Sequence, residues 1–148
     1  MRNSSRSLIK VLGTLGLLPF LASTLTFHFD FYGHGFLAQS VFVAYSAIIL
    51  SFLSGAIWGQ VLEQPFQAKG KALLIGSNLV AISAWCGLLI QQPHMSLLLL
   101  LCGYISIFWL EVRWLKQIRP DQSFYPNLRF ILTTLVCALH LLMLYPRF

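Results

Sequence analysis

The stretch Tyr45–Gly59, which reads YSAIILSFLSGAIWG, decides the fold of this chain. It contains no charged side chain, and a small residue recurs at every fourth position. Because an α-helix turns once in about 3.6 residues, these small residues lie along one helix face. Small residues let a neighbouring helix approach closely in lipid. The stretch therefore predicts a membrane-spanning helix with a helix-packing stripe, which we call the small-residue stripe: Ala47, Ser51, Gly55 and Gly59.

A packing face is the usual role of such a stripe, and a groove for a ligand is the alternative. If the stripe packs against a neighbouring helix, a large side chain within it should block the approach. We therefore expect Gly55→Leu to destabilise the bundle.

The composition excludes an ordinary soluble domain. Charged residues make up 9% of the 148 residues, against about 25% in soluble proteins. Hydrophobic residues make up 57%, and the mean hydropathy is +0.76. A soluble protein of this size cannot bury so much apolar surface. The length suits one domain, so we expect a single membrane domain over residues 1–148.

Uncharged runs mark the crossings, each of which needs about 20 apolar residues. The run from Ala72 to Leu110 is long enough for two, and Gln91-Gln92-Pro93-His94 interrupts it. Proline lacks an N–H group and glutamine is costly in hydrocarbon, so this point is a surface turn. The sequence predicts an all-α, polytopic membrane helix bundle with five transmembrane helices, at about 8–27, 37–59, 72–90, 95–115 and 128–145.

The distribution of basic residues predicts the orientation. Nine of the ten lie at one side of the predicted membrane, which places the N-terminus inside and the C-terminus outside. Because they lie at helix ends and form no soluble patch, nucleic acid is not an expected partner. The lipid bilayer is, together with a membrane-protein partner or a second copy of the chain. The nine are Arg2, Arg6, Lys10, Lys69, Lys71, Arg113, Lys116, Arg119 and Arg129, with Arg147 opposite.

The first predicted helix has two notable features. Its basic beginning resembles a secretory signal peptide, but the apolar run continues to Phe29, so we expect it to be retained. Pro19 cannot donate a hydrogen bond to the carbonyl of Leu15, so a kink is expected there. The freed carbonyl needs another partner. A packing kink is one interpretation, and a kink that shapes a small cavity is the other.

Several polar and aromatic residues are candidates for contacts. Asn78 lies inside the third predicted helix, where an amide normally bonds to another helix, so we count it with the packing residues. Tryptophan, tyrosine and charged residues near helix ends favour the membrane interface. Glu111 is the acid closest to the hydrocarbon, and a cationic neighbour is its expected partner. The interface candidates are Trp58, Glu111, Arg113, Tyr125 and Arg129.

No catalytic, cofactor-binding or metal-ligating residue is predicted. All four histidines, His140 among them, fall on the outer side with spacing that fits no metal site. The three cysteines lie inside predicted helices without CxxC spacing, which favours packing. We see no nucleophile–base–acid set and no buried charge in mid-membrane. Glu111 and His140 belong at opposite ends of the bundle, so they cannot act as an acid–base pair.

Four stretches together resemble one family. Leu12–Phe20 reads LGTLGLLPF, Tyr45–Gly59 is quoted above, Ala84-Trp85 lies in the third helix, and Phe124–Thr134 reads FYPNLRFILTT. In this order they resemble the domain of unknown function 3429 family of small multi-spanning membrane proteins, whose eukaryotic relatives include transmembrane protein 69. The resemblance implies the fold and a membrane location, but no activity. Relatives often have a polar residue before the tryptophan, where this chain has Ile57.

Three functions remain open. The first is a non-catalytic interaction, assembly or regulatory subunit, because functional intramembrane sites usually contain ionisable residues. The second is a small carrier or channel, although transporters commonly show the internal repeats that this chain lacks. The third is a membrane-embedded lipid-acting enzyme. The resemblance implies the bacterial inner membrane, with the mitochondrial inner membrane as the alternative.

Overall fold

The predicted five-helix membrane bundle is confirmed by the computed structural model, which describes residues 2–30, 33–62, 68–115 and 124–146. These residues contain helices and turns and no strand. Five segments are long and apolar enough to cross a membrane. They are Ser7–Phe29, Gly35–Leu62, Gly70–Leu89, Pro93–Arg113 and Asn127–Leu144. Each begins and ends within a few residues of the corresponding predicted helix.

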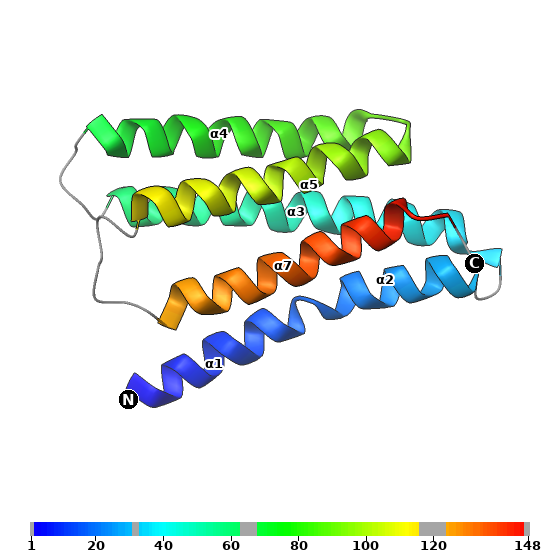
Figure 1. Cartoon of the computed structure of the whole chain (residues 1–148), viewed down its shortest axis with the longest axis horizontal. Coiled ribbons are helices and arrows are strands. Elements are labelled where there is room, and N and C mark those ends of the chain that lie inside the picture. Colours follow the sequence, from blue (N-terminus) through cyan, green and yellow to red (C-terminus); the bar gives the residue numbers. More distant parts are fainter. Residues whose placement is uncertain (1, 31–32, 63–67, 116–123, 147–148) are drawn as a thin grey trace.

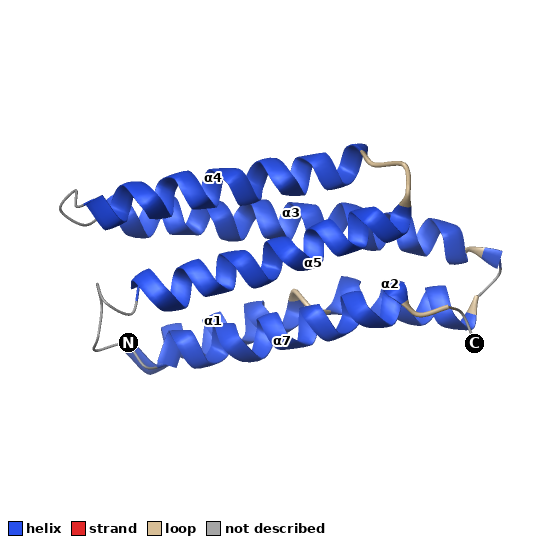
Figure 2. Ribbon diagram, turned by 45° about the horizontal axis from the view of Figure 1, so that its top comes forward, coloured by secondary structure: helices blue, strands red, loops and turns tan. Residues whose placement is uncertain are grey.

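The helices run along one common long axis (Figure 1). The first crossing is built from α1 (Arg2–Leu15) and α2 (Leu18–Phe29), and the second is α3 (Gly35–Leu62). The third is α4 (Ala68–Leu89), and the fourth is α5 (Pro93–Leu110), continued by the π-helix η2 (Glu111–Leu115). The fifth is α7 (Phe124–Leu144). The start of α1 and the end of α7 lie at opposite ends of the bundle in both views (Figures 1 and 2), as an odd number of crossings requires.

Four of the crossings surround a common centre. Helix α2 contacts α3 and α7, and α5 contacts the same two helices, so α2, α3, α5 and α7 form a closed ring. Helix α4 packs outside this ring against α3 and α5 (Figure 2). A large part of the α4 surface therefore faces away from the rest of the chain.

The first crossing is broken at Gly16–Leu17, just before Pro19. This confirms the expected kink, because the proline ring cannot complete the hydrogen bond of the preceding turn. The Tyr45 hydroxyl on α3 donates a hydrogen bond to the Gly16 carbonyl at 3.0 Å. A neighbouring helix thus satisfies a carbonyl at the break, as lipid requires.

Polar residues mark the turns between helices. Gln91 and Gln92 are exposed between α4 and α5, and Pro93 opens α5, so the predicted surface turn is confirmed. In the connection between α2 and α3, at the same end of the bundle, Asp30 ends α2 in the left-handed conformation with φ 44°. Its carboxylate accepts the Gly35 N–H at 2.9 Å, which caps the start of α3.

The core lies inside the ring, where large apolar side chains from all four helices are fully buried. Close approach of α5 to α3 depends on Gly103. A Cβ atom at this position would lie 2.5 Å from Cδ2 of Leu50, a buried side chain of α3. Likewise, a Cβ atom at Gly76 of α4 would lie 2.8 Å from Cδ1 of Leu110. These glycines, outside the predicted stripe, are the small residues that let neighbouring helices meet.

Candidate functional site

The small-residue stripe is split between the inside and the outside of the bundle. Ala47 is buried, with 1% of its surface exposed. Ser51, Gly55 and Gly59 are exposed, and a Cβ atom at either glycine would meet nothing within 4 Å. The expected close contact with a neighbouring helix of this chain is therefore wrong at Gly55 and Gly59. Contact of these residues with another molecule stays a prediction.

Asn78 also lies on the outside of the bundle. It is exposed on α4, eight residues after Gly70, where the candidate crossing Gly70–Leu89 begins, and therefore lies near the middle of that crossing. Ile82 and Trp85 on the same helix face are exposed as well. The buried side of α4, which includes Ser77 and Ala84, faces α3 and α5, so the Asn78 amide points away from these two helices. Its contact with a helix of another molecule stays a prediction.

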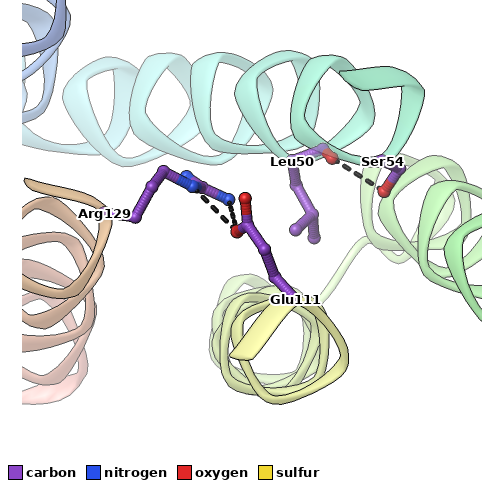
Figure 3. Close-up of polar contacts among 4 residues, drawn as sticks. All are labelled: Leu50, Ser54, Glu111 and Arg129. Carbon is purple, nitrogen blue, oxygen red and sulfur yellow. Dashed lines mark hydrogen bonds and ion pairs between the residues drawn. The ribbon is translucent and has the colours of Figure 1, made fainter. Parts of the chain in front are cut away.

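Glu111 and Arg129 form a buried ion pair. Oε2 of Glu111 lies 2.8 Å from Nη2 and 2.9 Å from Nε of Arg129. Figure 3 shows the two side chains pointing toward one another, from the helix end that carries Glu111 and from α7. The nearby Ser54 hydroxyl donates to the Leu50 carbonyl of its own helix at 2.9 Å. The cationic partner expected for Glu111 is present, and both side chains are buried in the bundle. Their placement at the membrane interface stays a prediction.

The ion pair coincides with a change of helix type. The α-helix of α5 ends at Leu110, and Glu111 is the first residue of the π-helix η2. Its backbone N–H contacts the carbonyls of both Ile107 and Phe108. Single π-turns are rare and occur frequently at functional sites. Here the change of winding occurs at the residue that presents its carboxylate to Arg129.

The other interface candidates lie near the same end. Trp58 and Arg113 are exposed, which fits an interfacial position. The guanidinium carbon of Arg113 lies 5.1 Å from the centroid of the Trp109 ring, in a cation–π contact. Tyr125 belongs to the first turn of α7, and its side chain lies outside the described part of the chain.

A second polar cluster, which the sequence analysis missed, lies at the centre of the ring. We call it the central cluster: the polar residues Ser46 of α3, Tyr104 of α5 and His140 of α7, with the apolar ring of Phe20 of α2 packed beside them, all almost fully buried. The Ser46 hydroxyl lies 2.8 Å from Nε2 of His140. The Tyr104 hydroxyl donates to the Ser46 carbonyl at 2.9 Å. Each helix of the ring thus contributes one residue.

The hydrogen bonds of His140 determine which ring nitrogen carries the hydrogen. Nδ1 lies 2.8 Å from the Val136 carbonyl, which can only accept, so Nδ1 is a donor. In the neutral ring Nε2 is then the acceptor for the Ser46 hydroxyl. This is also the hydrogen bond of a serine nucleophile and its base. No acidic side chain of the described residues completes a nucleophile–base–acid set here, because Nδ1 faces a backbone carbonyl, and both side chains are closed off from the surface.

Aromatic rings close the central cluster. The His140 ring centroid lies 4.8 Å from that of Phe42, 5.3 Å from that of Tyr104 and 6.1 Å from that of Phe20. His140 does lie near the predicted outer end of the fifth crossing, four residues before Leu144. It is, however, packed inside the bundle, whereas His34 and His94 are exposed. In the described part of the chain, no three His, Cys, Asp or Glu side chains gather as a metal site.

One sequence signal pointed to the central cluster. His140 interrupts an uncharged stretch, and an ionisable residue inside a membrane segment is by default a candidate for function. Ser46 gave no such signal, because serine is ordinary at helix interfaces in lipid. Ninety-four residues separate the two, so only the fold brings them together.

The comparisons with known proteins agree with this architecture. A family model described as Protein of unknown function (DUF3429) matches residues 5–145. The Xenopus tropicalis protein named Transmembrane protein 69 is 37% identical over 84 residues, which cover 55% of this chain and 32% of that relative. The aligned region thus spans about a third of the relative's length. No solved structure matches the chain. Because the family model covers nearly all of it, this multi-pass helical chain belongs to the family described as Protein of unknown function (DUF3429).

Proposed function

We propose that this chain is a non-catalytic membrane protein that binds another membrane-embedded protein and serves in the assembly or regulation of a complex. One observation carries the proposal: Asn78 is exposed near the middle of α4, on a helix that packs outside the ring. The amide of Asn78 therefore faces the lipid or a partner protein outside the bundle.

The physical argument is the satisfaction of a polar group in lipid. An amide moved from water into a hydrocarbon without hydrogen bonds loses about 2–7 kcal/mol. Other polar residues of α4 avoid this loss within their own helix: Ser77 donates to the Leu74 carbonyl and Ser83 to the Val80 carbonyl. A polar group on a partner helix would stabilise Asn78 by about 0.6–2 kcal/mol. The exposed part of the small-residue stripe gives the neighbouring α3 a second surface that a partner helix can approach closely.

A non-catalytic role fits the burial of the Ser46–His140 pair. Both side chains are fully buried, with aromatic rings around the imidazole. A serine nucleophile must meet the substrate at hydrogen-bonding distance from its base. The closed packing supports a structural role for the pair, in which it joins α3 to α7.

We propose the bacterial inner membrane as the location, with the mitochondrial inner membrane as the alternative. The Xenopus protein, a eukaryotic relative that is 37% identical over 84 residues, supports keeping the mitochondrial alternative. The excess of basic residues on one side supports a cytoplasmic (or matrix) N-terminus and an outer C-terminus.

The test of the proposed function is association that depends on Asn78. The full chain, purified from membranes in a mild detergent, should run as a complex with a mass above that of one chain. Asn78→Leu should reduce the fraction of that complex, whereas the control Gln92→Leu, at the exposed α4–α5 turn, should leave it unchanged. Mass spectrometry of the complex distinguishes a different protein from a second copy. A particle with the mass of one chain, or equal association in both variants, contradicts the proposal.

A small carrier or channel is the second candidate, and the Glu111–Arg129 pair favours it. Ionisable residues inside membrane segments often mark ion or proton paths. If this candidate is correct, liposomes containing the chain should show ion or proton flux above empty liposomes, and Glu111→Gln should reduce that flux. Equal flux with and without the chain contradicts this candidate.

A further inference from the structure

An open groove runs between α4 and α5 on the outside of the bundle. It has a volume of about 570 Å³, within the range of about 300–1,000 Å³ typical of ligand sites. Five of its lining residues are small. They are Gly76, Ser83, Cys102, Gly103 and Ser106, and Trp109 lines the groove at its inner end.

A cation lies at the same inner end of the groove. Arg113 is exposed, and its guanidinium group lies over the ring of Trp109, which is itself a lining residue. Ser106 and Trp109 are three residues apart on α5 and therefore share one side of the helix. The cation–π contact places Arg113 of η2 beside Trp109. The apolar groove and its charge are thus parts of one continuous surface.

We propose that this groove binds an anionic phospholipid, with the headgroup at Arg113 and one acyl chain along the groove. A basic residue at the membrane surface attracts anionic headgroups by about 1 kcal/mol, which corresponds to about a fivefold preference over a zwitterionic headgroup. The contact with Trp109 holds the guanidinium beside the groove. The charge can therefore bind the headgroup of the same lipid molecule whose acyl chain lies in the groove. A partner helix would fit the apolar surface but would give no reason for the cation at its end.

The groove is separate from the surface that the proposed function uses. Asn78, Ser51, Gly55 and Gly59 are absent from its lining. Lys71 provides a control, because it is an exposed cation near the same end of α4. It lies five positions before Gly76, which is about 140° around the helix and therefore away from the groove.

The experiment is native mass spectrometry of the full chain with phosphatidylglycerol and phosphatidylcholine of identical acyl chains. The wild type should retain about five times more phosphatidylglycerol. Arg113→Gln should reduce this ratio to about one, and Lys71→Gln should leave it unchanged. Equal retention of the two lipids by the wild type overturns the proposal, as does an equal loss in both charge variants.

A second pair of variants tests the groove itself. Ser106→Leu fills it and should reduce phosphatidylglycerol retention several-fold. Thr134→Leu adds a similar side chain to the exposed face of α7 and should not. Circular dichroism and thermal unfolding check that both variants are folded. If Ser106→Leu changes the mass of the particle and leaves lipid retention unchanged, the groove is a protein contact and the proposal is wrong.

Discussion

One carboxylate oxygen of Glu111 receives a hydrogen bond of 2.9 Å from Nε of Arg129 and lies 2.8 Å from Nη2 of the same guanidinium, in an ion pair. Only 9% of the Glu111 side chain and 10% of the Arg129 side chain are exposed. Eighteen positions separate the two, and their pairing joins the end of the fourth crossing to the start of the fifth. The desolvation of both charges makes such a pair weak evidence for net stability, but it makes the loss of one partner severe.

The first prediction concerns this pair. Glu111→Leu leaves the Arg129 guanidinium buried without its partner, so we expect the free energy of unfolding to fall by about 3 kcal/mol. The double variant Glu111→Leu/Arg129→Leu buries no unpaired charge and should be more stable than the single variant. Thermal unfolding in detergent measures both. If the loss of stability in the double variant equals the sum of the losses in the single variants Glu111→Leu and Arg129→Leu, the pair does not act as a unit.

The second prediction concerns the central cluster. Ser46→Ala removes the hydroxyl that His140 contacts and leaves a buried ring nitrogen without a partner, so we expect a loss of about 1–2 kcal/mol in stability. Ser51→Ala, on the exposed side of the same helix, should change stability by less than about 0.5 kcal/mol. The same unfolding measurement compares the two. Equal stability of the two variants would argue against a stabilising role for the Ser46–His140 contact.

The positions of the helices followed from the sequence, because lipid tolerates few charges and uncharged runs must coincide with crossings. The direction in which each helix faces did not follow. A helix that lies in water shows a polar side, but in lipid both sides are apolar. On α3, Phe42 is fully buried and Phe52 is 69% exposed. Because the two sides of α3 have similar polarity, the sequence analysis wrongly expected Gly55 to face the inside of the bundle.

The candidate sites were predictable only in part. The position of Glu111 next to an apolar run indicated that it needs a cationic partner, because an acidic side chain beside hydrocarbon rarely lacks one. Arg129 as that partner required the arrangement of α5 against α7. The central cluster needs one residue from each of four helices, and no local pattern encodes such a meeting.

The third prediction compares two glycines of neighbouring helices. Gly103→Leu places a side chain where Leu50 already lies, so we expect a marked loss of stability or of folded yield. Gly55→Leu adds a side chain in open space and should leave the stability of the single chain nearly unchanged. This replaces the expectation from the small-residue stripe. Folded yield and thermal unfolding separate the two, and a Gly55→Leu variant as unstable as Gly103→Leu would restore the original interpretation.

The fourth prediction tests the orientation of the bundle. The excess of basic residues predicts that the first residues face the cytoplasm and that the α4–α5 turn faces outside. Single-cysteine variants Ser7→Cys and Gln92→Cys, both at exposed positions, report these two ends once Cys86, Cys102 and Cys137 are replaced by alanine.

In intact bacterial cells whose outer membrane has been made permeable, a maleimide that cannot cross the inner membrane should label Gln92→Cys and not Ser7→Cys. Ser7→Cys should be labelled once the inner membrane is opened, which shows that its thiol is reactive. Labelling of Ser7→Cys alone in intact cells would reverse the orientation. The Glu111–Arg129 pair and Arg113 would then lie toward the outer leaflet, because they share one end of the bundle with the first residues.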